Sequence, residues 1–359
     1  MKPDPQAFQE SAARALQRVP ADRPVSFDWL EQHGLLGMAC AWANELDLPT
    51  DLREDLQAWR SAYAAQWLSW QQCWPEALAA LEAPLVLKGA ALNTWLYPDP
   101  TLRPVGDLDI LINSADREAA CDALLAQGYH PELAVDGDLV MTQQRFTLDN
   151  HHGTTCHLDL HWQSSNRSEL AAALSYEALI NLSEEASPGL RVLTPAAAWL
   201  HAAAHLLGHH ADRPAMKWLL DLHLIWELLS PSQRSDLVEL ATRLGLAPIA
   251  SATLELCSDT LGTRFSETAR HRLLAGARQR TRHYVSGRST LLQDLRALPR
   301  FRPRLRYLRQ LVFPSRRFMD ARGFGGHPLG YLRRLAGGLA KALNRALDRG
   351  RADSRDPRW

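Results

Sequence analysis

Two acidic residues separated by a single leucine are the clearest chemical signal in this chain. Asp107 and Asp109 flank Leu108 in DLDILIN, where polar and apolar residues alternate as in a β-strand. Side chains two residues apart in a strand share a face, so these two carboxylates lie side by side. Neighbouring like charges repel unless a cation lies between them, and carboxylate oxygens are ligands that Mg²⁺ prefers. The pattern therefore predicts a divalent metal site.

A second segment, HLDLHW, repeats this arrangement about fifty residues later. His157, Asp159 and His161 share one strand face there, while the residues between them face the core. Asp159 is the expected third metal ligand, since three acids on neighbouring strands can hold two metal ions around a triphosphate. His161 is a candidate for orienting the acceptor or carrying a proton, although Asp159 could itself act as the base.

An isolated Asp-x-Asp is more often an ordinary exposed strand, so the residues upstream matter. APLVLKG reads as a short strand that ends at Lys88 and Gly89 and opens into a helix. A helix N-terminus offers backbone N–H groups and the positive end of the helix dipole to an anion. Arg103, in the loop before the acidic strand, could reach the same phosphates or be a plain surface arginine. Lys88, Gly89 and Arg103 are therefore the candidate phosphate-binding residues.

Together, VLKGAALNTWLYPDPTLRPVGDLDILI and HLDLHW resemble the uncharacterised bacterial nucleotidyltransferase family of the polymerase-beta superfamily. The resemblance covers roughly residues 84–225, because Leu200-His201, His205 and KWLLD continue it. It implies an α+β fold, in which a polymerase-beta-type core with a short mixed sheet is flanked by N- and C-terminal helical regions. It also implies metal binding by Asp107, Asp109 and Asp159, with two Mg²⁺ ions, or Mn²⁺, as cofactor.

The function that this resemblance implies is transfer of a nucleoside monophosphate from an NTP to a hydroxyl or phosphate group. The acceptor would be a small molecule or a protein, and the sequence does not identify it. Two alternatives stay open. One is a non-catalytic scaffold that binds a nucleotide or a partner protein through the same fold. The other is a toxin-like nucleotidyltransferase that modifies RNA or protein.

His201, His205 and His209 recur every four residues and so line one face of a predicted helix. We expect this face to close over the nucleotide or the acceptor. Core histidines with satisfied hydrogen bonds are the second interpretation, and a metal site is the third, because no glutamate follows His201 as a zinc protease motif requires. His205, Lys217 and Asp221 are the residues expected to face the substrate.

The distribution of residue types along the chain predicts four regions. They are helices in 1–82, the nucleotidyltransferase core in 83–192, a helical bundle in 193–280 and a basic, partly amphipathic helical tail in 281–359. In the core, strands are expected at 84–89, at 107–113, through Phe146 and through Asp159, with a helix capped by Ser114 and ended by Gly128 between the second and the third. In the bundle, helices are expected at 196–210, 214–230, 232–246 and 247–262. Tryptophans recur at helical spacing in the first region, which favours a packed helix face over a binding box. They are Trp59, Trp67, Trp70 and Trp74.

A formal net charge of zero conceals a strongly basic tail. Residues 281–359 hold 18 Arg and 1 Lys against 5 Asp, a net +14 that leaves −14 on the rest. The first interpretation is a solvated helical cap that neutralises the acidic body. Docking on an anionic membrane is the second, because leucines recur every four residues near the end, and nucleic-acid contact is the third. These leucines are Leu335, Leu339, Leu343 and Leu347.

The five cysteines show no paired spacing, so the sequence predicts neither a disulfide framework nor a zinc site made of cysteines. The segment at residues 1–17 lacks the pattern of a secretion signal, and no apolar run approaches eighteen residues. We therefore expect a cytoplasmic location.

Overall fold

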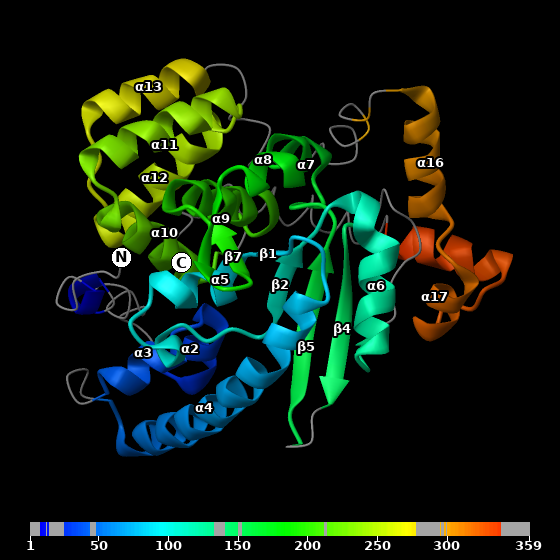
Figure 1. The fold of residues 1–359 in the computed structure, drawn as a ribbon, viewed down its shortest axis with the longest axis horizontal. Helices are drawn as coiled ribbons and strands as arrows, with labels where there is room; N and C mark the ends of the chain where they lie inside the picture. Colours follow the sequence, from blue (N-terminus) through cyan, green and yellow to red (C-terminus); the bar gives the residue numbers. More distant parts are fainter. Residues whose placement is uncertain are drawn as a thin grey trace.

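The computed structural model describes residues 8–11, 13, 25–43, 48–132, 141–149, 153–211, 214–277, 295, 298 and 300–338. Within these residues, a seven-stranded sheet of order β3-β4-β5-β2-β1-β7-β6 lies at the centre, with helices around it (Figure 1). The strands are β1 (Leu85–Val86), β2 (Leu108–Leu111), β3 (His130–Pro131), β4 (Gln143–Asp149), β5 (Thr155–His161), β6 (Ser183–Ser187) and β7 (Leu190–Leu193).

The sheet is mixed, as predicted. β1 runs antiparallel to β2 and parallel to β7, while β2 runs parallel to β5, which forms an antiparallel hairpin with β4. The four expected strands correspond to β1, β2, β4 and β5. The hairpin β6–β7 was not predicted, because the exposed SEEAS segment of β6 carries no hydrophobic alternation.

One face of the sheet is apolar and is covered by α4 (Thr50–Ala79) and α6 (Arg117–Ala126) (Figure 1). Leu108 and Ile110 of β2, with Leu158 and Leu160 of β5, pack on that side against Trp70, whose Nε1 donates to the Thr155 carbonyl at 3.0 Å. Trp70 and Trp74 are buried, and Trp59 and Trp67 pack against the cores, which confirms the packed helix face. The polar alternate residues of β2 and β5 therefore point to the opposite side.

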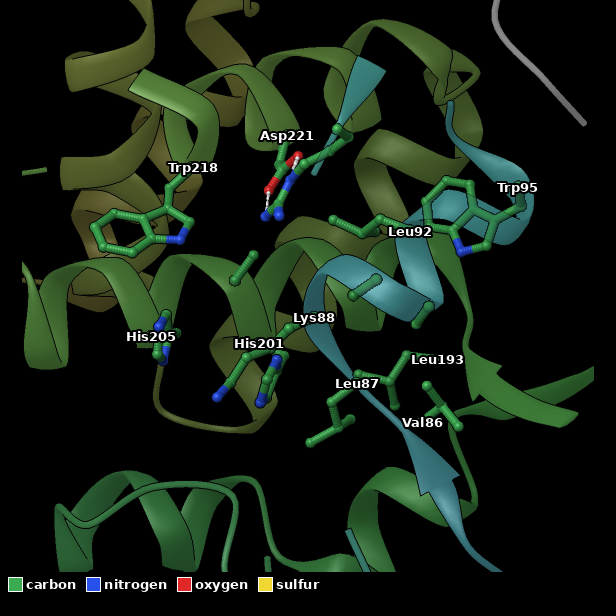
Figure 2. Close-up of a pocket in the computed structure, with 14 residues that line it drawn as sticks. Val86, Leu87, Lys88, Leu92, Trp95, Leu193, His201, His205, Trp218 and Asp221 are labelled. Carbon is green, nitrogen blue, oxygen red and sulfur yellow. Dashed lines mark hydrogen bonds and ion pairs between the residues drawn. The ribbon is translucent and has the colours of Figure 1, made fainter. Parts of the chain in front are cut away.

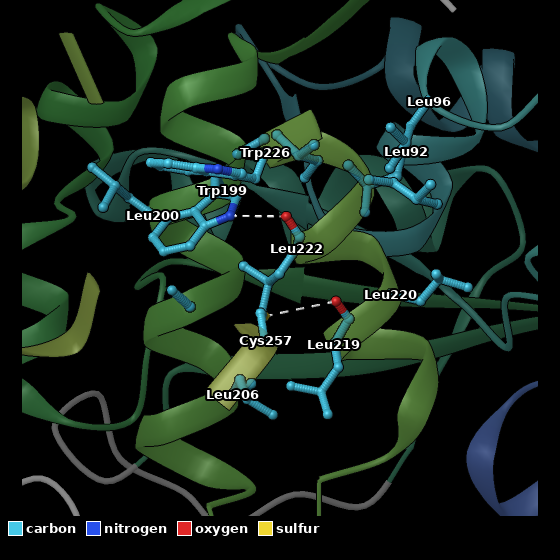
Figure 3. Packing of buried hydrophobic residues seen from close by; sticks show 14 of the residues in the cluster. Leu92, Leu96, Trp199, Leu200, Leu206, Leu219, Leu220, Leu222, Trp226 and Cys257 are labelled. Atoms are coloured by element: carbon cyan, nitrogen blue, oxygen red, sulfur yellow. Dashed lines mark hydrogen bonds between the residues drawn. The ribbon is translucent and has the colours of Figure 1, made fainter. Parts of the chain in front are cut away.

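Apolar residues on that opposite side, among them Leu85 and Leu111, share a hydrophobic core with a set of helices. The four helices between Pro195 and Leu261 start and end within a few residues of the predicted bounds. Trp199 of α9 (Pro195–His209) and Trp226 of α10 (Met216–Leu228) pack between these two helices. Trp199 Nε1 donates to the Leu222 carbonyl at 2.9 Å (Figure 3). Leu30 and Leu35 of the N-terminal helices belong to the same hydrophobic core. The helices are α2 (Phe27–His33), α3 (Leu36–Ala41), α9 (Pro195–His209), α10 (Met216–Leu228), α11 (Pro231–Arg243), α12 (Ala247–Leu261) and α13 (Glu267–Ala277).

Shorter elements complete the chain. The helix expected from Ser114 begins at Arg117 instead, because Asn113 caps a preceding 3-10 turn by accepting from the Ala115 N–H at 3.0 Å. The remaining elements are α5 (Lys88–Trp95), η1 (Pro100–Leu102), η2 (Ser114–Asp116), α7 (Ser168–Ala173), α8 (Tyr176–Ile180), α16 (Phe301–Val312) and α17 (Arg316–Ala321).

The hydrophobic cores do not follow the predicted region boundaries. One core joins the N-terminal helices to α9–α12, and the other joins the second half of α4 to the sheet and α6. The division into four regions stays a prediction. Of the tail leucines, Leu339, Leu343 and Leu347 lie outside the described residues. Among the helices that the structure describes, none has the length and apolarity needed to cross a bilayer.

Candidate metal and nucleotide site

The parallel pairing of β2 with β5 places Asp109 directly opposite Asp159. Both side chains are buried, at 5% and 3% exposure, on the face away from the α4–α6 core. One ligand atom from each, together with one from His161, lies within 4.8 Å of the other two. Asp107 directly precedes β2 and is half-buried. The structure thus brings the acids of both predicted motifs into one cluster.

Asp109 is held by two neighbours. Lys88 Nζ lies 2.6 Å from Asp109 Oδ1, and His161 Nε2 lies 2.8 Å from the same oxygen. Burial alone would raise the pKa of this carboxyl, but Lys88 and the hydrogen bond to His161 hold it below its usual range. Asp109 is therefore an anion at neutral pH, with Lys88 as its counter-charge.

Arg145 on β4 is the main residue of the site that the sequence did not reveal. Its Nε donates to Asp159 Oδ1 at 2.7 Å, and its Nη2 donates to Asp159 Oδ2 at 3.1 Å and to Asp107 Oδ2 at 3.0 Å. Gln143 Nε2 also donates to Asp159 Oδ2, at 2.9 Å. The hairpin register pairs Arg145 with Asp159, so a correct register for the predicted hairpin would have revealed it.

The pKa of Asp107 reflects both its burial and the crowding of three carboxylates. Burial, followed by the charges of Asp109 and Asp159, raises its pKa to about 6, although Lys88 and Arg145 oppose the change. Three carboxylates thus share two neighbouring cations from the chain itself. The remaining excess of negative charge is the condition in which an added divalent cation is most favourable.

The donor set fits a hard divalent metal. Asp109 and Asp159 supply carboxylate oxygens, which suit Mg²⁺ and Mn²⁺, and His161 supplies an imidazole, which suits Mn²⁺ better than Mg²⁺. Asp107 lies outside this close group, and Arg145 bridges its carboxylate to that of Asp159. The residues that could hold a metal directly are therefore Asp109, Asp159 and His161, with Asp107 beside them.

The turn between β1 and α5 is unusually tight. Lys88 has φ +54°, a left-handed conformation that residues other than glycine seldom adopt, and such strain concentrates at functional sites. A Cβ on the next residue, Gly89, would lie 2.6 Å from Val105 Cγ1 and 2.7 Å from Arg103 Nη1. Gly89 is therefore needed for the close approach of the loop that carries Arg103. Its predicted role in phosphate binding stays a prediction.

Arg103 and Asp221 form a buried ion pair that ties this loop to α10. The Nε and Nη2 of Arg103 lie 3.1 and 2.7 Å from the two oxygens of Asp221, and Tyr97 Oη donates to Asp221 Oδ1. The pKa of Arg103 lies above its usual value because Asp221 outweighs burial. Both residues line the cavity described next, so the substrate contacts predicted for them remain predictions.

A narrow cavity of about 40 Å³ lies between α5, α9 and α10 (Figure 2). Lys88, Arg103, His201, His205 and Asp221 line it together with aliphatic side chains and two tryptophans. His201 is 3% exposed, and its Nε2 has no hydrogen-bond partner among the described residues. The cavity thus joins the predicted phosphate turn to the predicted histidine face.

The histidine face is electrically neutral at physiological pH. Burial, followed by the charge of Lys88, lowers the pKa of His201 to about 3 and that of His205 well below its usual value. Burial and His210 lower the pKa of His209 to about 4. In the part of the chain that the structure describes, these histidines form no group with metal-ligand spacing. A substrate would meet uncharged imidazoles here.

Lys217 on α10 does not line the cavity, but it interacts electrostatically with Arg103, Asp221 and Asp107, and it differs from the cations at the acids and the cavity. Lys88, Arg103 and Arg145 each contact a carboxylate, whereas among the described residues no acidic group lies within ion-pair distance of Lys217. Its ammonium lies 5.7 Å from the centroid of the Trp218 ring. Burial, followed by the charge of Arg103, lowers its pKa to about 8. Lys217 is therefore the cation best able to accept an added anion.

The geometry defines a mixed α/β protein with a buried cluster of acids beside a strained strand-to-helix turn and lysine side chains, a combination suited to handling phosphate groups. Residues 21–262 match the model of a family described as uncharacterised nucleotidyltransferase, and the chain belongs to that family. The resemblance recognised in the sequence is thereby confirmed. No curated protein matches the chain.

Proposed function

We propose that this chain transfers a nucleoside monophosphate from an NTP to a hydroxyl or phosphate group on a small molecule or a protein, through a polymerase-beta-type core. The observation that carries the proposal is the pairing of Asp109 with Asp159 on neighbouring parallel strands, within ligand distance of His161. Membership of a nucleotidyltransferase family supports the same reaction class.

Asp109 and Asp159, with Asp107 beside them, would hold Mg²⁺, as two ions, or Mn²⁺. The metal would supply charge that stabilises the attacking and leaving oxygens in line. The Lys88 ammonium lies next to Asp109, so it could also bind an oxygen of a phosphate group that is held beside this carboxylate. Lys217 would bind a second phosphate group, because the part of the chain that the structure describes offers it no carboxylate within ion-pair distance.

Beside the charged residues of the site, the chain supplies the uncharged imidazoles of the histidine face. The imidazoles of His201 and His205 can each donate one hydrogen bond and accept one without adding charge. Such groups suit a neutral hydroxyl of the acceptor or the sugar. Asp159, with Arg145 as its present partner, is the base candidate for the acceptor proton, and His161 is the other. A toxin-like enzyme acting on RNA or protein would use the same residues and differ only in its acceptor. The cytoplasmic location stays a prediction.

The test is transfer of label from each α-³²P-labelled NTP into a metabolite extract or into protein, with Mg²⁺ or Mn²⁺ present. We expect transfer by the natural chain and its loss in Asp109→Asn and Asp159→Asn. Asp122→Asn, an exposed aspartate on α6, is the matched control. Circular dichroism establishes that the variants fold. Equal transfer by Asp109→Asn and the natural chain would refute the assignment.

One observation favours the alternative of a non-catalytic nucleotide-binding scaffold. Arg145 and Lys88 already contact the three carboxylates and so supply cations of the chain where a metal would otherwise be required. On this alternative, calorimetry would detect NTP binding that is unaffected by Mg²⁺ and by EDTA. On the proposed function, NTP affinity rises with Mg²⁺ and the rise disappears in Asp159→Asn.

A further inference from the structure

Residues 300–338 form a strongly basic part of the molecule, here called the basic arm. The arm contains α16, α17 and a further helical stretch at 328–338. Ten arginines and one aspartate, Asp320, occupy these thirty-nine positions. Figure 1 shows α16 and α17 on the side of α6, at the opposite end of the molecule from α11–α13. The arm takes no part in the candidate nucleotide site.

α16 divides its surface between apolar and basic residues. Phe301, Leu305, Leu308 and Val312 follow one another at spacings of four, three and four, which places them on one face. The same spacing displaced by one position aligns three arginines on the adjacent face, about 100° around the helix axis. They are Arg302, Arg306 and Arg309. The helix is amphipathic and cationic.

The apolar face of α16 is exposed at Phe301 and Leu305 and partly exposed at Leu308 and Val312. Phe301 is 77% exposed and Leu305 is 56% exposed, and no residue of α16 is buried. Phe313, Leu329 and Leu332, further along the arm, are exposed as well, at 62–72%. A helix that capped the acidic body would bury such a face. The arm instead presents large apolar side chains beside a row of arginines.

We propose that the basic arm docks on an anionic phospholipid surface. A helix with an apolar face beside arginines lies in the interface of a bilayer, where the apolar side chains enter the acyl boundary and the guanidinium groups meet the phosphate head groups. Each arginine near an anionic leaflet strengthens the binding by about fivefold. Nucleic acid would use the arginines but would leave Phe301, Leu305 and Leu329 exposed, so lipid accounts for both halves of the surface. This proposal does not rest on the nucleotide chemistry.

The experiment is co-sedimentation of the full chain with phosphatidylcholine vesicles that contain or lack phosphatidylserine. The natural chain is expected to bind the anionic vesicles at least about tenfold more tightly than the neutral ones. Leu305→Gln keeps the net charge and the helix propensity but removes the apolar anchor, so binding should fall about tenfold or more. Arg302→Gln with Arg309→Gln should have a similar effect through charge.

The matched control is Leu68→Gln on α4, because Leu68 is a similarly exposed leucine, at 62%, outside the arm. It should bind like the natural chain. Absence of binding to anionic vesicles overturns the proposal. Binding that survives Leu305→Gln overturns it too, since charge alone would then suffice. If the arm binds a DNA or RNA duplex equally with and without Leu305, and binds no vesicles, its partner is nucleic acid and the proposal is wrong.

Discussion

Arg145 and Asp159 are register partners on the β4–β5 hairpin, and the guanidinium bonds both oxygens of that carboxylate while also reaching Asp107. The chain therefore places its own cation at the acids that would bind a metal. A metal ion that binds there must displace the guanidinium of Arg145. The competition between the two cations can be measured as a change in metal affinity.

The first prediction follows from that competition. Arg145→Met removes the competing guanidinium, so the affinity for Mn²⁺ should rise about tenfold or more, since charge-assisted bonds of this kind contribute roughly 1.5 to 3 kcal/mol. Isothermal calorimetry and the electron paramagnetic resonance of bound Mn²⁺ measure it. Arg117→Met on α6, whose guanidinium lies over Trp162, is the control. Weaker Mn²⁺ binding by Arg145→Met would instead mean that the arginine orients Asp159 for the metal.

The second prediction concerns the pH dependence of stability. Asp107 has a folded pKa of about 6, above the value of about 3.9 expected when unfolded, so the folded chain binds the proton more tightly. The contribution of Asp107 to the free energy of unfolding should therefore fall as pH rises from about 4 to about 6 and stay reduced above that, whatever the buried histidines contribute in both the natural chain and Asp107→Asn. In EDTA, Asp107→Asn should be more stable than the natural chain above pH 6, by about 1 to 2 kcal/mol after allowance for partial exposure. Urea unfolding at pH 4 and pH 8 measures the difference, which should nearly vanish at the lower pH.

How much of this site the sequence predicts depends on how far apart in the sequence the contacting residues are. Alternation in DLDILIN and HLDLHW was enough to place Asp109 and Asp159 on one face of neighbouring strands, because side-chain direction in a strand is a local property. Arg145 was missed because its position depends on the hairpin register, and a slip of one residue reverses the face. The pairing of Arg103 with Asp221, 118 residues apart, has no local signal at all.

The same contrast holds for the fold. The helices α9 to α12 were predicted to within a few residues at each end, because their apolar periodicity is strong and Pro or Gly marks many of their ends. The edge hairpin β6–β7 was missed, because an exposed edge strand needs no apolar alternation. The strained φ of Lys88 also left no trace in residue type, since only glycine would have signalled it.

The third prediction tests the tight turn. Gly89→Ala introduces a Cβ within 2.7 Å of Val105 and Arg103, so the loop must move, at a cost of about 1 to 3 kcal/mol in unfolding free energy. Gly106→Ala is the control, because no atom lies within 4 Å of the added Cβ, and its stability should stay within about 0.5 kcal/mol of the natural chain. Chemical denaturation compares the two. Equal stability of both variants would contradict the packing described for Gly89.

The fourth prediction concerns the buried pair between the loop and α10. Arg103→Met leaves Asp221 charged and buried, with Tyr97 as its one remaining hydrogen-bond partner among the described residues, and should cost about 3 to 5 kcal/mol. The exposed pair Arg316–Asp320 gives a matched comparison, since Arg316→Met should have little effect on stability. Thermal unfolding distinguishes them. A small effect of Arg103→Met would mean that the pair does not join the loop to the helix.

The fifth prediction separates charge from position at Lys217. A lysine with a pKa of about 8 is only partly protonated just above neutrality, so the affinity for an NTP should fall as pH rises through about 8, because the anion loses its cationic partner. Lys217→Met should raise KM with a smaller change in kcat and should flatten this pH dependence. Lys217→Arg should restore the affinity while keeping the profile flat, since the guanidinium stays charged. An unchanged KM and an unchanged pH profile in Lys217→Met would show that this lysine does not bind the triphosphate, and the cationic partner of the substrate would then have to be Lys88, released from Asp109.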